Sequence, residues 1–440
     1  MKHQVIFILS YCMAWHVAAT DITFSWNGSA DESGNVIRLD APASTGLNGG
    51  IYVAPSVKGL RIEASSPSSS GIKWHKFTSM GAAYAQEIEA TANHGNQSWL
   101  DNPEGNAGYI VDDGKQQVYL WIVDHSSYPL IFSSLSESDS HDCQYLDLDF
   151  SGSADEIVYF GINGRRNTLP RDISLTYTTL EWDDSRDQYI QTGVDTILDH
   201  ISKNIHVSAP LCATTFTLTG DRFAKTWGRE VTYTSPLFPA RSITAHTEVI
   251  STERTADNET STASPGTLGG SAPYTATFRA EVSDAAVFHE WQFSRSPDFQ
   301  EIYLREPETT FTHTFDERGT TYVRLYCTND DASCEYFSET YEVGIGESSL
   351  KCPNAFTPFN QDGVNDEWKV SYSSIIEYEC HIFNRYGKKI VSLSDPSQGW
   401  DGRSGGKFVA PGTYYYVIKA RGADGKNYKL SGDINIIEHR

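Results

Sequence analysis

The sequence has few basic residues and, beyond its first twenty positions, no long hydrophobic run. Its 440 residues include 34 Lys and Arg against 57 Asp and Glu, which gives a formal net charge of −23. A surface this acidic repels phosphate backbones, so nucleic acid is excluded as a favoured partner. A membrane-spanning helix needs roughly 20 apolar residues. Because no later segment approaches that length, no integral membrane span is expected.

Common catalytic and metal-binding motifs are also missing. The sequence contains no H-E-x-x-H, Walker A, dinucleotide fingerprint or C-x-x-C spacing. The segment from Gly402 to Gly406 fits G-x-S-x-G, but a short strand ending at Pro411 follows it where a nucleophile elbow needs a helix. We interpret it as a glycine-rich turn. Acidic pairs such as Asp112-Asp113 are typical of solvated loops. No catalytic residue, cofactor or metal site is therefore predicted.

The first segment reads as a targeting signal. A positive start at Lys2, an apolar run from Val5 to Trp15 and small residues before Thr20 predict a secretory signal peptide over residues 1–19. Six of the seven cysteines remain after its removal. An even number of cysteines in an exported chain favours disulfides over zinc.

Three disulfides are predicted from these six cysteines. Cys327 and Cys334 flank a short polar turn, so a bridge across it is geometrically easy. Cys352 and Cys380 lie in what we interpret as one domain. Cys143 and Cys212 are then paired by elimination.

The body of the chain predicts an all-β fold. Short runs rich in Tyr, Val, Ile and Thr alternate with Gly, Asn, Asp, Ser and Pro clusters, as expected for tandem immunoglobulin-like β-sandwiches. Helices are expected only at 80–91 and 196–204. The polar stretch 251–270 reads as a linker, and 344–349 as a second junction. The predicted divisions are a β-sandwich at 20–136, a β module at 137–208, a β module and linker at 209–265, and two further domains at 266–346 and 350–440.

The 266–346 unit resembles a polycystic-kidney-disease (PKD) type immunoglobulin-like domain. The resemblance rests on Trp291-Gln292-Phe293, on Phe311 to Phe315 and on the Gly319 turn that leads to Tyr322 and Val323. It implies a β-sandwich in which Trp291 anchors the core, and a spacer or adhesion role. The Cys327/Cys334 pair departs from the family pattern.

The 350–440 unit carries the most specific pattern in the chain. It resembles the gliding-motility-associated C-terminal domain, the type B sorting signal of type IX secretion. The landmarks occur in the family's order and are Pro353, Asn354, Phe356, Pro358, Asp362, Gly363, Asn365, Asp366, Asn384, Arg385, Gly387, Trp400, Asp401, Gly402, Pro411, Gly412, Tyr414, Tyr415 and Tyr416. The resemblance implies a β-sandwich, type IX secretion machinery as partner, export through the outer membrane and display on the cell surface. One departure is a first loop that is one residue longer and lacks one glycine.

Some of these landmarks have two interpretations. Asp362, Asn365 and Asp366 favour side chains that cap a turn, and calcium is the alternative. Trp400 and the tyrosine run favour packing of a sandwich face, and a recognition patch for the transport machinery is the alternative. Arg385, at a strand end, is the best candidate for a polar contact.

Three functions are compatible with the N-terminal modules. The leading hypothesis is a structural or adhesive surface protein without catalysis, for which another surface protein is a candidate partner. The second is a carbohydrate-binding protein that recognises a surface glycan, with Trp99 in a polar, loop-like segment as the ligand candidate. The third is a hydrolase with paired carboxylates in these modules.

Overall fold

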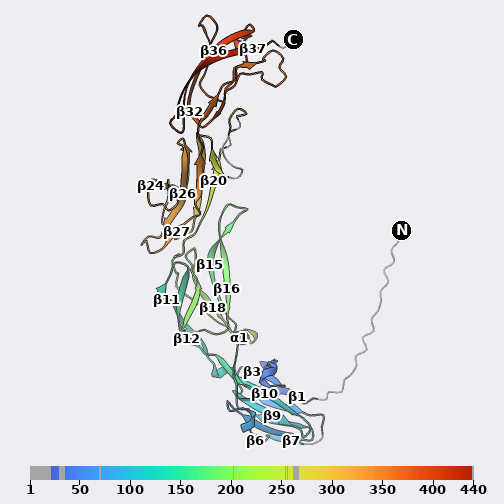
Figure 1. Cartoon of the computed structure of the whole chain (residues 1–440). Coiled ribbons are helices and arrows are strands. Elements are labelled where there is room, and N and C mark those ends of the chain that lie inside the picture. The colour runs from blue at the N-terminus through green and yellow to red at the C-terminus, as the bar shows by residue number, and fades with distance from the viewer. Residues whose placement is uncertain are drawn as a thin grey trace, which may run out of the picture.

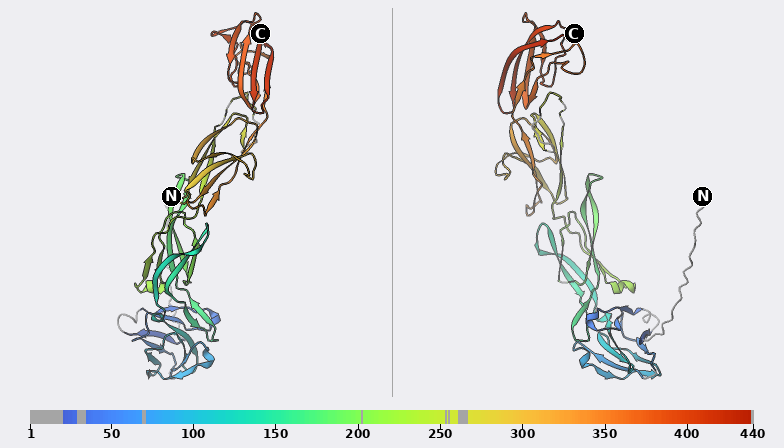
Figure 2. Two further views of the ribbon diagram at one scale, coloured as in Figure 1. Left: turned by 90° about the vertical axis from the view of Figure 1, so that its left-hand side faces the viewer. Right: turned by 45° about the vertical axis from the view of Figure 1, so that its right-hand side comes forward.

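The computed structural model describes residues 21–28, 35–68, 71–201, 203–252, 254, 256–260 and 267–438. The predicted signal peptide at 1–19 lies outside these residues. The described chain forms four β-rich units in a row, so that the molecule is a rod with its N-terminal unit at one end and its C-terminal unit at the other (Figures 1 and 2). This confirms the predicted all-β fold class of tandem sandwiches.

Module 1 is a sandwich of a four-stranded and a six-stranded sheet. The first sheet has the order β1-β4-β8-β7 and the second β2-β3-β10-β9-β5-β6. Its elements are β1 (Thr23–Asn27), β2 (Ile37–Leu39), η2 (Ala43–Thr45), β3 (Gly50–Ala54), β4 (Arg61–Ser65), β5 (Lys73–Phe77), η3 (Ala82–Tyr84), β6 (Gln86–Ile88), β7 (Ala92–His94), β8 (Gln97–Asp101), β9 (Ala107–Asp112), β10 (Gln117–Asp124) and η4 (His125–Ser127), where η denotes a 3₁₀ turn.

The centre of the six-stranded sheet is buried on both faces. Strands β3 and β10 are continuous apolar runs rather than alternating ones, which is typical of strands covered on both sides. Tyr52 and Leu120 face the four-stranded sheet, whereas Val53 and Trp121 face the other way. A hairpin and a helix from module 2 cover that second face.

Module 2 is a sandwich of two sheets, β11-β12-β17 and β16-β15-β18-β19, with an additional hairpin β13-β14. Its elements are β11 (Leu130–His141), β12 (Tyr145–Ala154), β13 (Ile157–Phe160), β14 (Arg166–Leu169), β15 (Ile173–Asp183), β16 (Gln188–Leu198), β17 (Asn204–Ser208), β18 (Thr217–Gly220), α1 (Arg222–Thr226) and β19 (Val231–Thr234). Ile157 and Tyr159 of the hairpin and Phe223 of α1 complete the core on the outer face of module 1.

Several sequence expectations need correction here. The boundary expected at 136/137 falls inside β11, and the boundary expected at 208/209 falls inside one sandwich, because β15 pairs with β16 on one side and β18 on the other. Residues from both sides of 208 share one core. The helix expected at 196–204 is replaced by the ends of β16 and β17. The one expected at 80–91 is a 3₁₀ turn followed by β6. Both segments lie beside other strands, and tertiary pairing overrides their local propensity.

Module 3 begins before the predicted linker, because β20 pairs with β22. Its sheets have the orders β20-β22-β25 and β21-β28-β26-β23-β24, with β27 paired to β26. Its strands are β20 (Ala245–Ser251), β21 (Leu268–Gly270), β22 (Tyr274–Val282), β23 (Phe288–Ser294), β24 (Ile302–Glu306), β25 (Thr310–Phe315), β26 (Gly319–Thr328), β27 (Glu335–Phe337) and β28 (Tyr341–Ile345). Trp291 is fully buried against Phe278, which confirms it as a core anchor.

The C-terminal domain is built on the five-stranded sheet β30-β37-β36-β32-β33, with two small sheets beside it. Its strands are β29 (Ser349–Lys351), β30 (Ala355–Phe356), β31 (Ser371–Ser373), β32 (Ile375–Phe383), β33 (Lys389–Leu393), β34 (Arg403–Ser404), β35 (Lys407–Phe408), β36 (Gly412–Gly422) and β37 (Asn427–Ile436). Trp368, Tyr372 and Trp400 fill its core.

Candidate functional surfaces

The described residues contain no group of three or more His, Cys, Asp or Glu side chains that could hold a metal ion. The Gly402–Gly406 segment is confirmed as a turn: Arg403 and Ser404 of β34 pair with β35, and the glycines on both sides have positive φ. Among the same residues, no helix is long and apolar enough to cross a membrane.

The predicted disulfide pattern is wrong. Cys143 bonds to Cys334, whereas the other four cysteines outside residues 1–19 carry free thiols. Cys327 points into the core of module 3, away from the turn that holds Cys334, and Cys212 is buried in module 2. Burial raises the pKa of Cys327 to about 12 and that of Cys380 to about 11. These thiols stay protonated at neutral pH, so they lack the nucleophilic form.

Trp99 lies on a strand rather than in the loop that we expected. In β8 it pairs with Glu63 of β4 on one side and Ala92 of β7 on the other, on the outer face of the four-stranded sheet. The Arg61 guanidinium lies 5.1 Å from its ring centroid, and His94 stacks on it at 5.1 Å. These neighbours come from the strands on either side of β8. A sugar that stacked on this indole would have to displace one of them.

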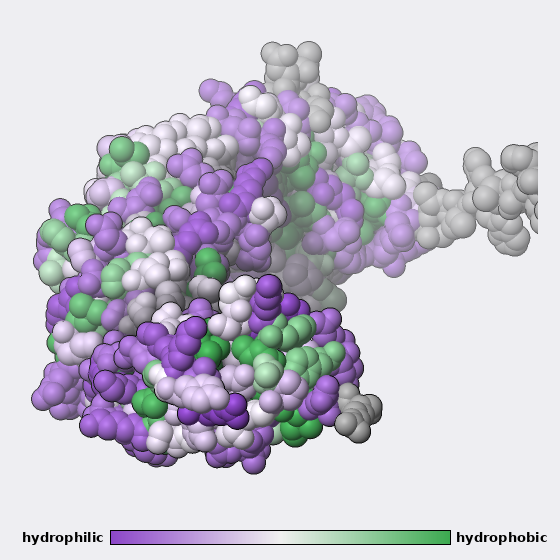
Figure 3. Space-filling model, turned by 90° about the horizontal axis from the view of Figure 1, so that it is seen from above, coloured by the Kyte–Doolittle hydropathy of each residue, from purple (hydrophilic) through white to green (hydrophobic). Residues whose placement is uncertain are grey.

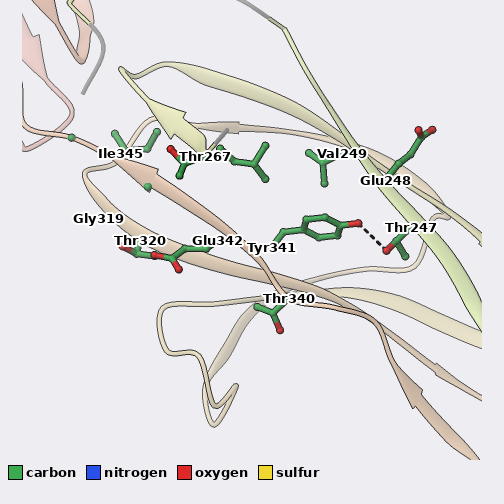
Figure 4. A pocket seen from close by; sticks show the side chains of 13 residues that line it. Thr247, Glu248, Val249, Thr267, Gly319, Thr320, Thr340, Tyr341, Glu342 and Ile345 are labelled. Atoms are coloured by element: carbon green, nitrogen blue, oxygen red, sulfur yellow. Dashed lines mark hydrogen bonds between the residues drawn. The ribbon is translucent and has the colours of Figure 1, made fainter. Parts of the chain in front are cut away.

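A cavity of about 1020 Å³ opens between the sheets of module 3. Thr247 and Val249 of β20 line one side, and Tyr341 and Ile345 of β28 line the other. Figure 4 shows Tyr341 reaching across to Thr247, and its hydroxyl lies 2.8 Å from the Thr247 Oγ1. Burial is the largest of the effects that raise the pKa of Tyr341. The lining holds hydroxyls, apolar groups and the carboxylates of Glu248 and Glu342, and the Glu248 carboxylate turns away from the ring (Figure 4).

The joint between modules 1 and 2 contains a buried ion pair of module 2 that contacts His125 of module 1. Arg171 Nε donates to Asp221 Oδ2 at 2.8 Å, and His125 Nε2 lies 3.0 Å from the same oxygen. The Arg171 and Asp221 side chains are fully buried. Arg171 also donates to the Tyr128 carbonyl, and the Asp221 carboxylate caps α1 through the Ala224 N–H. Burial acts to raise the pKa of Asp221, but the His125 hydrogen bond, the Ala224 N–H and the Arg171 charge lower it to about 2.

The joint between modules 2 and 3 is held on more than one side. The Cys143–Cys334 disulfide crosslinks the β11–β12 turn to the β26–β27 turn. The long β15–β16 hairpin reaches module 3 elsewhere, where Trp182 stacks flat on His246 at 3.7 Å. An ion pair between Asp187 and Arg279 lies close by. No sequence pattern indicated these contacts, because each joins residues far apart in the chain.

The joint between module 3 and the C-terminal domain uses part of the predicted linker, a segment of residues 256–260 that we call the strap. Asn258 Nδ2 donates to the carbonyls of Val370 and Pro396, at 2.7 and 2.8 Å. The Thr260 N–H donates to the Tyr372 carbonyl, and the Tyr372 N–H to the Asn258 carbonyl. The strap therefore pairs with β31 like an added strand, instead of forming a free linker.

The sorting-domain landmarks build the C-terminal domain in three ways. Phe356 and Trp400 pack against each other at 5.4 Å, and Tyr414 and Tyr416 also face the core. Other landmarks shape turns: Asp362 Oδ1 accepts the Val364 N–H, Asp366 Oδ2 accepts the Gly363 N–H, and Asn384 Oδ1 accepts the N–H groups of Tyr386 and Lys388. A third group, which includes Arg385 and Tyr415, is exposed. Packing thus accounts for Trp400, and turn capping for the acidic loop.

Comparison with known proteins identifies two of the units. Residues 134–235 match the fibronectin type III domain, and residues 350–436 match the CHU_C type IX secretion signal domain. No curated protein matches the chain.

Solved structures with distant similarity include three multi-domain proteins. A tetra-tandem repeat from the extending region of a large adhesion protein has 9% identity and a TM-score of 0.22, covering 88% of this chain and 97% of that one. Fibronectin(III)-like modules of Clostridium thermocellum CbhA have 13% identity and a TM-score of 0.17, covering 44% and 98%. Sidekick-1 immunoglobulin domains 1–5 have 10% identity and a TM-score of 0.24, covering 86% and 76%. The family match, and not these distant structures, identifies residues 350–436 as a type IX secretion signal domain. The protein is therefore exported through the outer membrane to the cell surface or the extracellular space.

Proposed function

We propose that the protein is a stiff, surface-displayed rod with a structural or adhesive role. The observation that carries this proposal is that all three joints between units are bridged by specific contacts. The first joint has a buried ion pair, the second a disulfide and a stacked hairpin, and the third the strap. A chain of independent sandwiches on free linkers would lack such bridges.

In this proposal, module 1 is the end that makes contact. It lies at the opposite end of the rod from the C-terminal domain (Figure 1). If the C-terminal domain stays at the outer membrane, module 1 is held farthest from the cell. The net charge of −23 repels anionic surfaces, so a neutral polysaccharide or a basic protein is the favoured contact. The PKD type of module 3 stays a prediction, as do glycan binding at Trp99 and a carboxylate-based hydrolase.

Two measurements test the proposal. Small-angle X-ray scattering on the purified mature chain should give one long, narrow shape, and a broad ensemble of shapes would contradict the stiff rod. Cells that display the chain should lose surface adhesion when an antibody fragment covers module 1. A fragment that covers module 3 serves as the control and should leave adhesion intact. If cells adhere equally well with either antibody fragment bound, module 1 is not the part of the protein that makes contact.

A further inference from the structure

One end of the C-terminal domain is occupied by the rest of the protein. The Ala272 N–H donates to Ser374 Oγ, and the Ser374 N–H donates to Ser271 Oγ at 2.7 Å. The Arg318 N–H donates to the Ala423 carbonyl in the β36–β37 turn. With the strap on β31, these contacts leave no room for a large partner at this base.

The opposite end, which we call the tip, is formed by three loops and a strand end. The loops are 357–365, 384–388 and 402–411, and the strand end is residue 437. The strand register places these loops together. At this end of the sheet, Phe383 of β32 pairs with Tyr415 of β36. Ile436 of β37 pairs with Gly412 of β36 on one side and with Phe356 of β30 on the other. Phe359 of the first loop touches Phe408 of the third at 5.3 Å.

The tip exposes large apolar and aromatic side chains. Tyr386 is 78% exposed, and four more exposed residues lie at this end: Val364, Phe408, Tyr415 and Ile437. Figure 3 looks down the rod onto the C-terminal domain, where hydrophobic residues gather on one side of the foremost part among hydrophilic ones. Exposed aromatic residues of this kind are enriched at protein interfaces.

The tip is basic, whereas the chain as a whole is acidic. Its three loops contain four cations, Arg385, Lys388, Arg403 and Lys407, against the one carboxylate of Asp362, in a protein of net charge −23. Asp401, which precedes the third loop, pairs with Arg403. Arg385 lies over the Tyr386 ring at 4.8 Å and Arg403 over the Phe408 ring at 3.7 Å, so each arginine is held against an aromatic ring. Asn384 and Gly387, with φ of 78°, fix the turn that presents Arg385 and Tyr386.

We propose that the tip is the docking surface for a protein of the type IX secretion machinery, with an apolar site rimmed by carboxylates. The inference rests on the secretion-signal match of this domain, and it is independent of the rod and adhesion proposal. The machinery must bind this domain, and the base is covered. The tip combines accessible aromatic area with a local charge that attracts an acidic partner.

The test uses the full chain expressed in its secreting host. The variants are Tyr386→Ser and the double charge reversal Arg385→Glu/Lys388→Glu. The matched control is Lys419→Glu/Lys429→Glu, which reverses two exposed, paired cations on the sheet away from the tip. We expect at least a tenfold loss of surface protein and accumulation in the periplasm for the tip variants, with the control at the wild-type level. Wild-type export of the tip variants would overturn the proposal.

Two further measurements separate docking from folding and from other partners. The purified variants should unfold at the wild-type temperature, because the substituted side chains are exposed in the wild-type protein. A variant that fails to be exported because it is unfolded in the cell would count against docking. A photo-crosslinker at position 386 should capture a type IX secretion component, and one at exposed position 426 near the base should not. Crosslinking at 386 to lipopolysaccharide or to a second copy of this chain, instead of that component, would also overturn the proposal.

Discussion

Cys143 of module 2 and Cys334 of module 3 are bonded to each other, although 191 residues separate them in the chain. The bond connects two sandwiches that each have a complete core of their own. It therefore fixes how one module sits on the next, rather than closing a turn inside one module.

Replacing Cys143 by Ser should loosen the joint and lower stability. A bond that closes so long a loop restricts the unfolded chain, and loss of a native disulfide typically costs roughly 2–5 kcal/mol. We expect a lower unfolding temperature and faster proteolysis between β19 and β20, measured by calorimetry and by limited digestion. Cys212→Ala, which removes a buried free thiol without breaking a bond, is the control. A peptide map of the oxidised protein with Cys327 bonded to Cys334 would contradict the assignment.

The buried Asp221 should make the first joint sensitive to acid. Its pKa is lowered from 3.8 to about 2 in the folded protein, so its contribution is fully present above pH 4 and is lost as the pH falls towards 2. A shift of this size corresponds to about 2 kcal/mol. Chemical unfolding of the mature chain between pH 5 and 2 should show this loss.

Asp221→Asn should remove that part of the acid dependence and also destabilise the protein at neutral pH. It leaves Arg171 buried without its counter-charge, which typically costs about 3–5 kcal/mol. Asp172→Asn breaks the partly exposed pair with Arg222 and should cost less than about 1 kcal/mol. An Asp221→Asn protein as stable as the control would show that the ion pair does not hold the joint.

The success of the sequence predictions depended on whether a contact was local. Trp291 and Trp400 were expected in cores because large aromatic residues in a β-rich chain are favoured in buried positions, and both are buried. Asn384 and Gly387 form their turn within five residues. The Cys143–Cys334 bond joins two neighbouring modules across 191 residues of sequence, so spacing favoured the wrong partners. Asn258 binds backbone carbonyls, which leave no mark in the sequence, and its polar surroundings were read as a free linker.

Asn258→Ala should weaken the attachment of the strap. The substitution leaves the Val370 and Pro396 carbonyls without their donor, and an unsatisfied buried group costs about 1–3 kcal/mol. Amide exchange in β31 should become faster, as measured by mass spectrometry. Asp257 lies in the same strap and forms an exposed ion pair with Lys369. Asp257→Ala removes this pair and should change amide exchange in β31 little. Unchanged exchange in both variants would show that β31 is stable without the strap.

Trp99→Ala tests whether module 1 binds glycans through this half-buried indole. The ring is already contacted by Arg61 and His94, so its removal should cost about 1 kcal/mol of cation–π and stacking energy and leave the buried core intact. Because these two side chains occupy the ring, we expect retention of the protein on immobilised polysaccharides to be the same with and without Trp99. Trp74→Ala, which empties a fully buried site, should instead cost about 3–5 kcal/mol and report on the core. Retention that disappears in Trp99→Ala while the unfolding temperature stays near wild type would place a sugar site on this strand, with the Arg61 and His94 side chains moving aside on binding.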